Sequence, residues 1–250
     1  MKEPIALRMD DVGASSKRFE VYSKRWLGLG NVLFLKYLPY FRAWGPYQEL
    51  SSADWQNIIQ MLHQYDAKLT VAVTASWVEK NGECIPYPDK WPEAYRALKQ
   101  GVNAARIRIA CHGLTHCVLD GKAFLPRPFS SNRTFHREFW PWLPVSVHYD
   151  HLARAKRILE TAFETEVNTL VPPGNVFSDD TIAAASRLGF QVLNCQTERR
   201  DQLGGLRVVG NDNVVAFHDR EVVLFGQEWL HKLLKQNAGR SHVFIDELHG

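Results

Sequence analysis

The sequence lacks long apolar runs and has few cysteines. No stretch of 18 consecutive apolar residues occurs, so no obvious membrane-spanning helix is predicted. Its four cysteines have neither C-x-x-C spacing nor the pattern of a disulfide framework, and we expect buried thiols. No run of five Lys or Arg appears and the formal net charge is only +3, which argues against a dedicated nucleic-acid-binding protein. The first residues have no signal-peptide pattern, so we expect a cytoplasmic location.

The hydrophobic pattern predicts an α/β barrel. Of the 250 residues, 45% are hydrophobic, enough for one well-buried core, and we expect one domain over residues 1–250. Apolar strands alternate about seven times with amphipathic helices, which favours parallel βαβ units closed or nearly closed into a barrel. The predicted strands are residues 5–9, 68–74, 107–110, 168–171, 190–194, 206–209, 214–217 and 242–245, and the predicted helices 51–65, 92–103, 148–164, 178–188 and 227–236.

A histidine pair follows the third predicted strand. His112 and His116 are four residues apart, and on a first helical turn they would project from the same side. Both imidazoles could then reach one zinc-sized cation at about 2.0–2.1 Å. The pair alone fits a half-exposed helical turn equally well. Cys111 and Cys117 flank it, and we interpret them as small buried hydrophobes rather than as a further thiolate ligand.

An acidic pair follows the first predicted strand. Asp10 and Asp11 come directly after the apolar residues 5–9, and strand ends are where α/β folds place their chemistry. One Asp with two His would give three protein ligands and an open position for water, the composition of a catalytic metal site. His218 ends another predicted strand and titrates in the range suited to proton transfer.

Two long connections interrupt the pattern. Residues 12–50 are rich in aromatics, and 26–40 form an apolar stretch that would serve as a lid or a membrane-surface contact, or would pack over the barrel mouth. We favour packing over the mouth. Residues 118–147 carry a second aromatic run, which suits either sugar rings or a satellite core.

The motifs together resemble the polysaccharide deacetylases, the NodB-homology group of carbohydrate esterase family 4. Met9-Asp10-Asp11 resembles the Phe-Asp-Asp motif, His112-Gly113-Leu114-Thr115-His116 the His-x-x-x-His motif, Val171-Pro172-Pro173-Gly174 the Arg-Pro-Pro-Tyr motif and Ala216-Phe217-His218-Asp219 the Leu-x-His motif, in the family's order. The resemblance implies a distorted (β/α) barrel. It also implies a divalent metal, expected to be zinc, held by Asp11, His112 and His116. Asp10 would be the general base, His218 the general acid and the Gly174 N–H an oxyanion donor.

The sequence departs from the family at its third motif. The arginine that normally orients the base is Val171, and the aromatic is Gly174. We hypothesise that Arg8 compensates, because residues i and i−2 of a strand share a face, so Arg8 and Asp10 should both point into the barrel. Glu198 or Asp201 could occupy the family's second acidic position. We interpret Asp219 as a turn or capping residue.

The predicted function is removal of an N-acyl group from an amino sugar. The substrate would belong to a surface glycan or to its lipid-linked or nucleotide-linked precursor, as in lipopolysaccharide biosynthesis, with peripheral membrane contact and no nucleic acid. Two alternatives stay open: a non-catalytic carbohydrate-binding barrel, and a metal-dependent hydrolase of another amide or ester. Six further histidines show no ligand spacing and are left out of the predicted site, namely His136, His148, His151, His231, His242 and His249.

Overall fold

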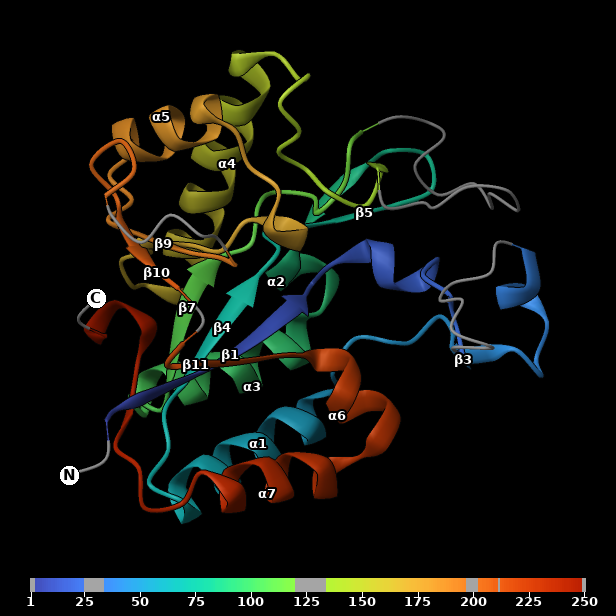
Figure 1. Ribbon diagram of the computed structural model, residues 1–250, viewed down its shortest axis with the longest axis vertical. Coiled ribbons are helices and arrows are strands. Elements are labelled where there is room, and N and C mark those ends of the chain that lie inside the picture. The colour runs from blue at the N-terminus through green and yellow to red at the C-terminus, as the bar shows by residue number, and fades with distance from the viewer. Residues whose placement is uncertain (1–2, 25–33, 120–133, 197–201, 211, 249–250) are drawn as a thin grey trace.

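The computed structural model describes residues 3–24, 34–119, 134–196, 202–210 and 212–248. The main sheet is parallel throughout, in the order β10-β9-β8-β7-β4-β1-β11, with β12 paired to the start of β1. Its strands are β1 (Ile5–Val12), β4 (Leu69–Val73), β7 (Ile107–Cys111), β8 (Thr169–Leu170), β9 (Val192–Asn194), β10 (Arg207–Val209), β11 (Val214–His218) and β12 (His242–Val243). The expected distorted barrel of about seven parallel strands is confirmed (Figure 1).

Helices cover the outer face of this sheet. In Figure 1, α4 and α5 lie beside β7 to β10, and α1, α3, α6 and α7 lie on the side of β1, β4 and β11. The helices are α1 (Ser52–Gln64), α2 (Tyr87–Lys90), α3 (Pro92–Asn103), α4 (Val145–Phe163), α5 (Asp179–Arg187), α6 (Asp219–Phe225) and α7 (Gln227–Gln236). Five of them were predicted; the short α2 and α6 were not. Ser51 and Ser178 cap α1 and α5 by accepting the N–H of the third helical residue, as their sequence positions indicate.

Strand alternation decides what enters the barrel. Leu7 and Met9 of β1 belong to the large core between sheet and helices, whereas Arg8 and Asp10 lie on the opposite face. The interior between the strands holds two small apolar clusters, one of Ala72, Ala110 and Val171 and another of Ala6, Val192, Val209, Val214, Ile245 and Leu248. The barrel interior therefore has room for charged groups near the ends of the strands.

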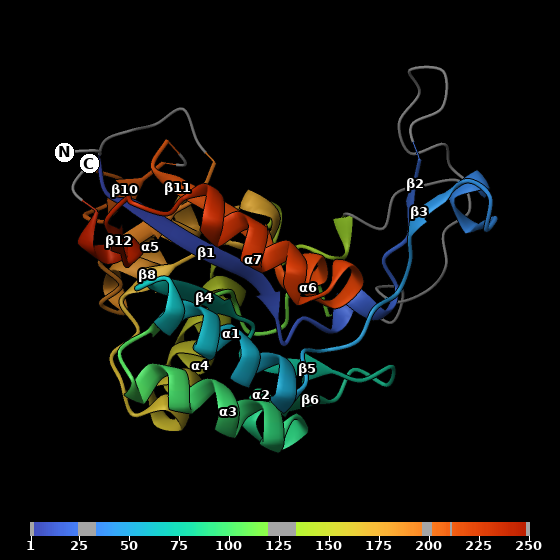
Figure 2. The ribbon, with the colours of Figure 1, turned by 90° about the horizontal axis from the view of Figure 1, so that it is seen from below.

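Two short hairpins and four 3₁₀ turns complete the described chain. The hairpins are β2 (Tyr22–Ser23) with β3 (Arg42–Trp44) and β5 (Ser76–Val78) with β6 (Cys84–Pro86), and the turns are η1 (Ser15–Arg18), η2 (Phe34–Tyr37), η4 (Pro173–Asn175) and η5 (Ile245–Glu247). The β2–β3 hairpin extends well beyond the body of the molecule (Figures 1 and 2). Residues 26–33, the larger part of the stretch that we expected to pack over the barrel mouth, lie outside the described residues, so that expectation stays a prediction.

Candidate metal centre and catalytic site

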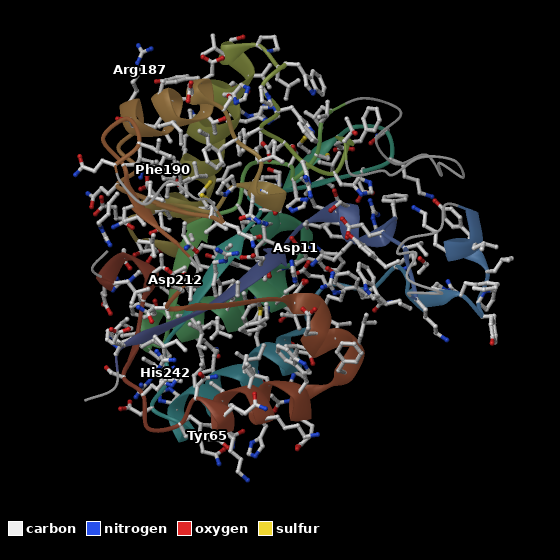
Figure 3. All side chains as sticks on the ribbon, in the orientation of Figure 1. Asp11, Tyr65, Arg187, Phe190, Asp212 and His242 are labelled. Atoms are coloured by element: carbon white, nitrogen blue, oxygen red, sulfur yellow. The ribbon has the colours of Figure 1, made fainter. Side chains whose placement is uncertain are left out.

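The three predicted metal ligands meet at one end of the barrel. Nε2 of His112 lies 3.3 Å from Oδ1 of Asp11, and Nε2 of His116 lies 3.1 Å from the same oxygen. The three ligand atoms lie within 4.8 Å of one another. Figure 3 places Asp11 at one end of the central strands and His242 at the other. This is the only such group of three among the residues that the structure describes.

A bulge in β1 presents Asp11 to the histidines. The register between β1 and β4 shifts between Met9 and Val12, and Asp11 has a φ of 69°. Neighbouring side chains of a regular strand point to opposite faces, so Asp10 and Asp11 could not otherwise both reach the same site. Aspartate tolerates this left-handed conformation better than most residues. We expected the acidic pair to follow the strand; it lies within it.

The segment that carries the two histidines is not helical, which corrects our prediction. Gly113 has a φ of 81° and His116 one of 56°, values that a right-handed helical turn does not contain. The turn wraps around the Glu138 carboxylate, which accepts the backbone N–H groups of Leu114, Thr115 and His116 at 2.9, 3.1 and 2.9 Å. A Cβ at position 113 would lie 2.1 Å from this carboxylate, so the turn requires glycine there.

Glu138 is buried and has one charged partner among the described residues, His151. Nδ1 of His151 lies 2.6 Å from Oε1 of Glu138. Burial raises the pKa of Glu138, but the His151 hydrogen bond and the backbone N–H groups outweigh it and the pKa is lowered. Burial lowers the pKa of His151, and Glu138 reverses this, so that pKa is raised. Sequence reasoning missed both residues because neither has ligand spacing; only the fold brings them to the histidine turn.

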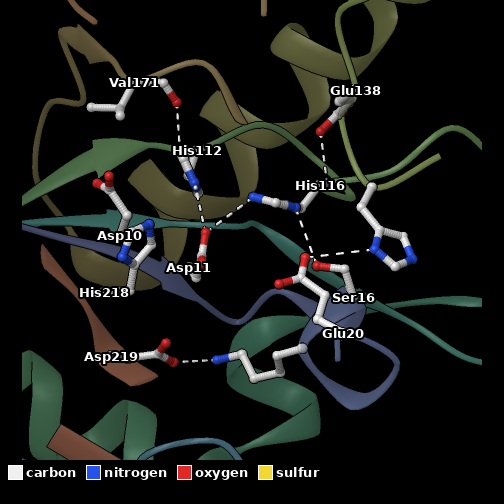
Figure 4. A network of polar contacts seen from close by, with 12 residues as sticks. Asp10, Asp11, Ser16, Glu20, His112, His116, Glu138, Val171, His218 and Asp219 are labelled. Carbon is white, nitrogen blue, oxygen red and sulfur yellow. Dashed lines mark hydrogen bonds and ion pairs between the residues drawn. The ribbon is translucent and has the colours of Figure 1, made fainter. Parts of the chain in front are cut away.

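The outer ring nitrogens of the two histidines are held in place. Nδ1 of His112 donates to the Val171 carbonyl at 2.7 Å, and Nδ1 of His116 lies 3.2 Å from Oγ of Ser16 (Figure 4). The first contact leaves Nε2 of His112 with a lone pair directed at Asp11, the usual arrangement of a metal-binding histidine. Nε2 of His116 is buried and faces Asp11 without the alignment of a hydrogen bond. Separations of 3.1 and 3.3 Å suit donors around one tetrahedral ion. The residues present fit a divalent cation.

The Asp11 carboxylate is held in its charged form. Burial alone would raise its pKa, but His218 and the adjacent His112 and His116 imidazoles bring that pKa well below its usual range. A metal ligand must be deprotonated, so this environment favours the binding form.

Arg8 forms a bidentate ion pair with Asp10, the predicted general base. Its Nε and Nη2 donate to the two carboxylate oxygens of Asp10 at 2.8 and 2.7 Å, and its Nη1 donates to Asn194 Oδ1. This bidentate pair gives the Asp10 carboxylate an arginine partner that position 171 does not supply, because Val171 is buried and offers only its carbonyl. Glu198 and Asp201 lie outside the described residues. The role of Arg8 stays a prediction.

His218 lies beside Asp10, its partner in the β1–β11 register. Burial lowers the pKa of His218, but Asp11, Glu221 and Asp10 outweigh it and raise the pKa to about 9. Glu221 lies 3.6 Å from the ring and also accepts the backbone N–H of His218 at 2.8 Å. Arg220 lies 3.3 Å from Nδ1 of His218. His218, the predicted general acid, is therefore protonated at neutral pH and can donate a proton.

The Pro-Pro-Gly turn lines the same cavity. Gly174, in η4, has a φ of 60°, and a Cβ there would lie 2.5 Å from Nε of Arg137. The Arg137 side chain thus fills the space next to the position at which the family has its aromatic. The cavity has a volume of about 260 Å³ and is lined by Asp10, Asp11, His112, His116, Gly174 and His218, with His136, Arg137 and Arg220 around them. His136, which we left out of the site, lies on its wall; the oxyanion role of Gly174 stays a prediction.

A group of buried ion pairs lies next to the site and connects the elements that carry its residues. Nζ of Lys17 donates to Oε2 of Glu49 at 2.8 Å and to Asp219, and Tyr47 donates to Oδ1 of Asp219 at 3.1 Å. The Lys17, Glu49 and Asp219 side chains are at most 1% exposed. Lys17 thus ties the residue after His218 to η1, which carries Ser16 (Figure 4). Asp219 is the first residue of α6 and His218 is the N-cap, so our interpretation of Asp219 as a turn or capping residue is wrong. Its buried pairing has no sequence signal.

The remaining predicted groups lie elsewhere. The thiols of Cys111, Cys117 and Cys195 are buried and unpaired, and Cys84 is half-buried. None of the four belongs to the metal cluster of the described residues. Within the described chain, no helix is long and apolar enough to cross a membrane.

Comparison with known proteins assigns a family to this arrangement. A family model described as polysaccharide deacetylase matches residues 45–193, more than half of the chain. The match includes His112, His116 and Gly174, whereas Asp10, Asp11 and His218 lie outside it and are brought to the site by the fold. Among curated proteins, none is similar enough in sequence to match.

Solved structures show the same fold at low identity. A structure described as T48 deacetylase with substrate is 13% identical, with a TM-score of 0.52, over 98% of this chain and 89% of its own. The 4-alpha-glucanotransferase of Thermococcus litoralis is 10% identical, with a TM-score of 0.51, over 78% of this chain and 35% of its own. BA3943 of Bacillus anthracis, described as a CE4 family pseudoenzyme, is 15% identical, with a TM-score of 0.48. The match covers 99% of this chain, which spans only 65% of the length of BA3943.

Proposed function

Because the chain belongs to the polysaccharide deacetylase family, we propose that it is a metal-dependent hydrolase that removes an N-acyl group, expected to be acetyl, from an amino sugar. The observation that carries this proposal is the convergence of Asp11, His112 and His116 on one point beside Asp10 and His218. The substrate would belong to a surface glycan or its precursor. The cytoplasmic location and the single domain over residues 1–250 stay predictions.

The residues of the chain divide the reaction among them. A divalent cation, proposed to be zinc and held by Asp11, His112 and His116, would supply a water of lowered pKa and polarise the acyl oxygen. Asp10 accepts the proton of the attacking water, and Arg8 keeps that carboxylate oriented. The N–H of Gly174 donates to the oxyanion.

His218 completes the hydrolysis. Water adds its oxygen to the acyl carbon, the C–N bond breaks, and His218 protonates the leaving nitrogen, so that an amine and a carboxylic acid are released. Its pKa of about 9 provides the protonated form at neutral pH.

Metal content and amine release test this proposal together. Wild-type protein should hold about one divalent cation per chain by elemental analysis and should release amine from N-acetylglucosamine oligomers. We expect His112→Ala to lose both, since one of three ligands is gone. His231→Ala is the matched control, because His231 contacts Tyr65 on the outer helices.

The other outcomes separate the alternative functions. Sugar binding with no amine release in the metal-loaded wild type would contradict the proposal and support a non-catalytic barrel. Release of another acid from an ester or another amide, with no action on N-acetyl sugars, would point to a different hydrolase.

A further inference from the structure

The described residues 21–24 and 34–46, together called the arm below, have an unusual composition. These 17 residues contain no Asp or Glu. They contain three basic residues, Lys24, Lys36 and Arg42, and six aromatic ones, Tyr22, Phe34, Tyr37, Tyr40, Phe41 and Trp44. A basic and aromatic segment without acids is typical of surfaces that bind anionic partners.

The arm makes no core of its own in its described part. Tyr22 stacks on Trp44 at 4.2 Å between ring centroids, and the two strands pair over only two positions. None of residues 21–24 and 35–46 is buried. Figures 1 and 2 show β2 and β3 extending away from the barrel in both views. So many apolar side chains outside any core indicate a surface that a partner covers.

The exposed end of the described arm combines apolar and basic groups. Leu38 is 47% and Tyr40 78% exposed, and both lie within three residues of the end of η2. Nζ of Lys24 lies 5.7 Å from the centre of the Tyr40 ring, and Arg42 is exposed in β3. Aromatic rings with basic residues beside them are the side chains that proteins place at the headgroups of anionic bilayers.

The base of the arm is part of the site. Tyr22 and Lys36 line the cavity that contains Asp11 and the two histidines. Arg220 lies over the Trp44 ring at 4.3 Å and also 3.3 Å from Nδ1 of His218. A surface that bound the arm would therefore lie close to the mouth of the cavity.

We propose that the arm docks this protein on an anionic lipid bilayer and so presents the cavity to amino sugars at the membrane surface. The positive charge of the arm favours anionic lipid, and its exposed Leu38 and Tyr40 favour an apolar interface over a soluble polyanion. Docking itself is independent of the catalytic proposal. The conclusion that the substrate is a lipid-linked amino sugar rests on the proposed function.

Vesicle co-sedimentation of the full chain tests the docking. Wild-type protein should sediment with vesicles of phosphatidylcholine and phosphatidylglycerol in a 3:1 ratio and much less with pure phosphatidylcholine. We expect Lys24→Glu with Arg42→Glu to weaken binding by about tenfold or more, since each basic residue near such a surface contributes. Leu38→Asp with Tyr40→Asp should weaken it similarly. Trp142→Asp, at a 58% exposed aromatic outside the arm, is the matched control and should bind as wild type.

A second measurement separates docking from catalysis. Amine release from an N-acetylglucosaminyl diphosphate with a long prenyl chain, embedded in these vesicles, should fall in both arm variants. Release from the same headgroup on a short, water-soluble chain should not change. No release from either substrate by wild type, with vesicle binding intact, would contradict the proposed function and leave docking standing.

Three results would overturn the docking proposal. One is wild-type protein that does not co-sediment with anionic vesicles. Another is binding to soluble polyuronate that equals vesicle binding and is insensitive to Leu38→Asp with Tyr40→Asp. The third is a wild-type dimer, detected by light scattering, that is absent in the same double variant. A second copy of the chain would then be the partner of the arm. A thermal unfolding midpoint equal to that of wild type would show that the variants are folded.

Discussion

The site and the arm differ in the burial of their side chains and in the pairing of their charges. Around the site, Lys17, Glu49, Glu138 and Asp219 are buried, and each is paired with an opposite charge. Of residues 21–24 and 35–46 of the arm none is buried, although aromatics are frequent. The candidate metal ligands are held by contacts within the fold, whereas the exposed side chains of the arm would be covered only by a partner outside the chain. The same chain thus contains a preorganised region and a region built for contact.

Buried ion pairs are a costly way to hold a site. Removing charges from water costs several kcal/mol per ion, which good geometry only partly offsets. Their concentration behind Asp11, His116 and His218 therefore indicates that they fix positions rather than add stability. Four variants, in order of decreasing expected effect, test this contrast with the arm.

Lys17→Met should have the largest effect on stability. It leaves the Glu49 and Asp219 carboxylates buried without their cation, which costs about 3–5 kcal/mol of unfolding free energy. Urea denaturation measures the loss. Lys68→Met is the control, because its pair with Glu247 is about one-third exposed on both sides and should contribute at most about 1 kcal/mol. Equal losses in the two variants would contradict the structural role of the buried group.

Glu138→Gln should loosen the histidine turn. An amide replaces a charged acceptor of three backbone N–H groups, and we expect divalent-cation affinity to fall about 10–100-fold. Isothermal titration with Zn²⁺ measures this change. Glu160→Gln serves as control, since Glu160 also accepts a backbone N–H, that of Val167 at 3.1 Å, but away from the histidines. Unchanged affinity in Glu138→Gln would show that the turn holds its shape without this carboxylate.

Glu221→Gln should shift the pH dependence of activity. His218 must be protonated to act as an acid, so activity is lost as pH rises through its raised pKa, about 9 without a cation. A bound cation offsets the charge of Asp11 and leaves Glu221 as a main support of that raised pKa. The variant should therefore lose activity at lower pH than wild type, seen in the alkaline limb of kcat/KM. A limb at the same pH would mean that His218 is not the titrating group.

Tyr40→Asp should have the smallest effect on the folded chain. Its ring is 78% exposed, and surface substitutions of this kind change unfolding free energy by about 0.5 kcal/mol or less. Denaturation should be unchanged while vesicle binding falls, which sharpens the contrast with Lys17→Met. A loss above about 1 kcal/mol would show that the arm packs more firmly on the body than its exposure indicates.

The order of the elements could be read from the chain, but the geometry of the site could not. Hydrophobic periodicity predicted the eight strands of the main sheet and five of the helices, because burial of an apolar face sets that pattern locally. The turn around Gly113 was mistaken for a helical one, because its shape comes from a carboxylate 25 residues later in the chain. Glu138, His151 and Lys17 have no motif and become visible only through their contacts.

The sequence by itself determined the alternation of strands and helices, the family motifs and the chemistry of the three candidate ligands. Tertiary structure alone decided that a bulge turns Asp11 toward the histidines, that Glu138 holds the histidine turn, and that residues 21–24 and 35–46 stay outside the core. The physical reason is range. The hydrophobic pattern and the turn residues reflect interactions between residues close in sequence. The buried charged residues pair with residues that are distant in sequence.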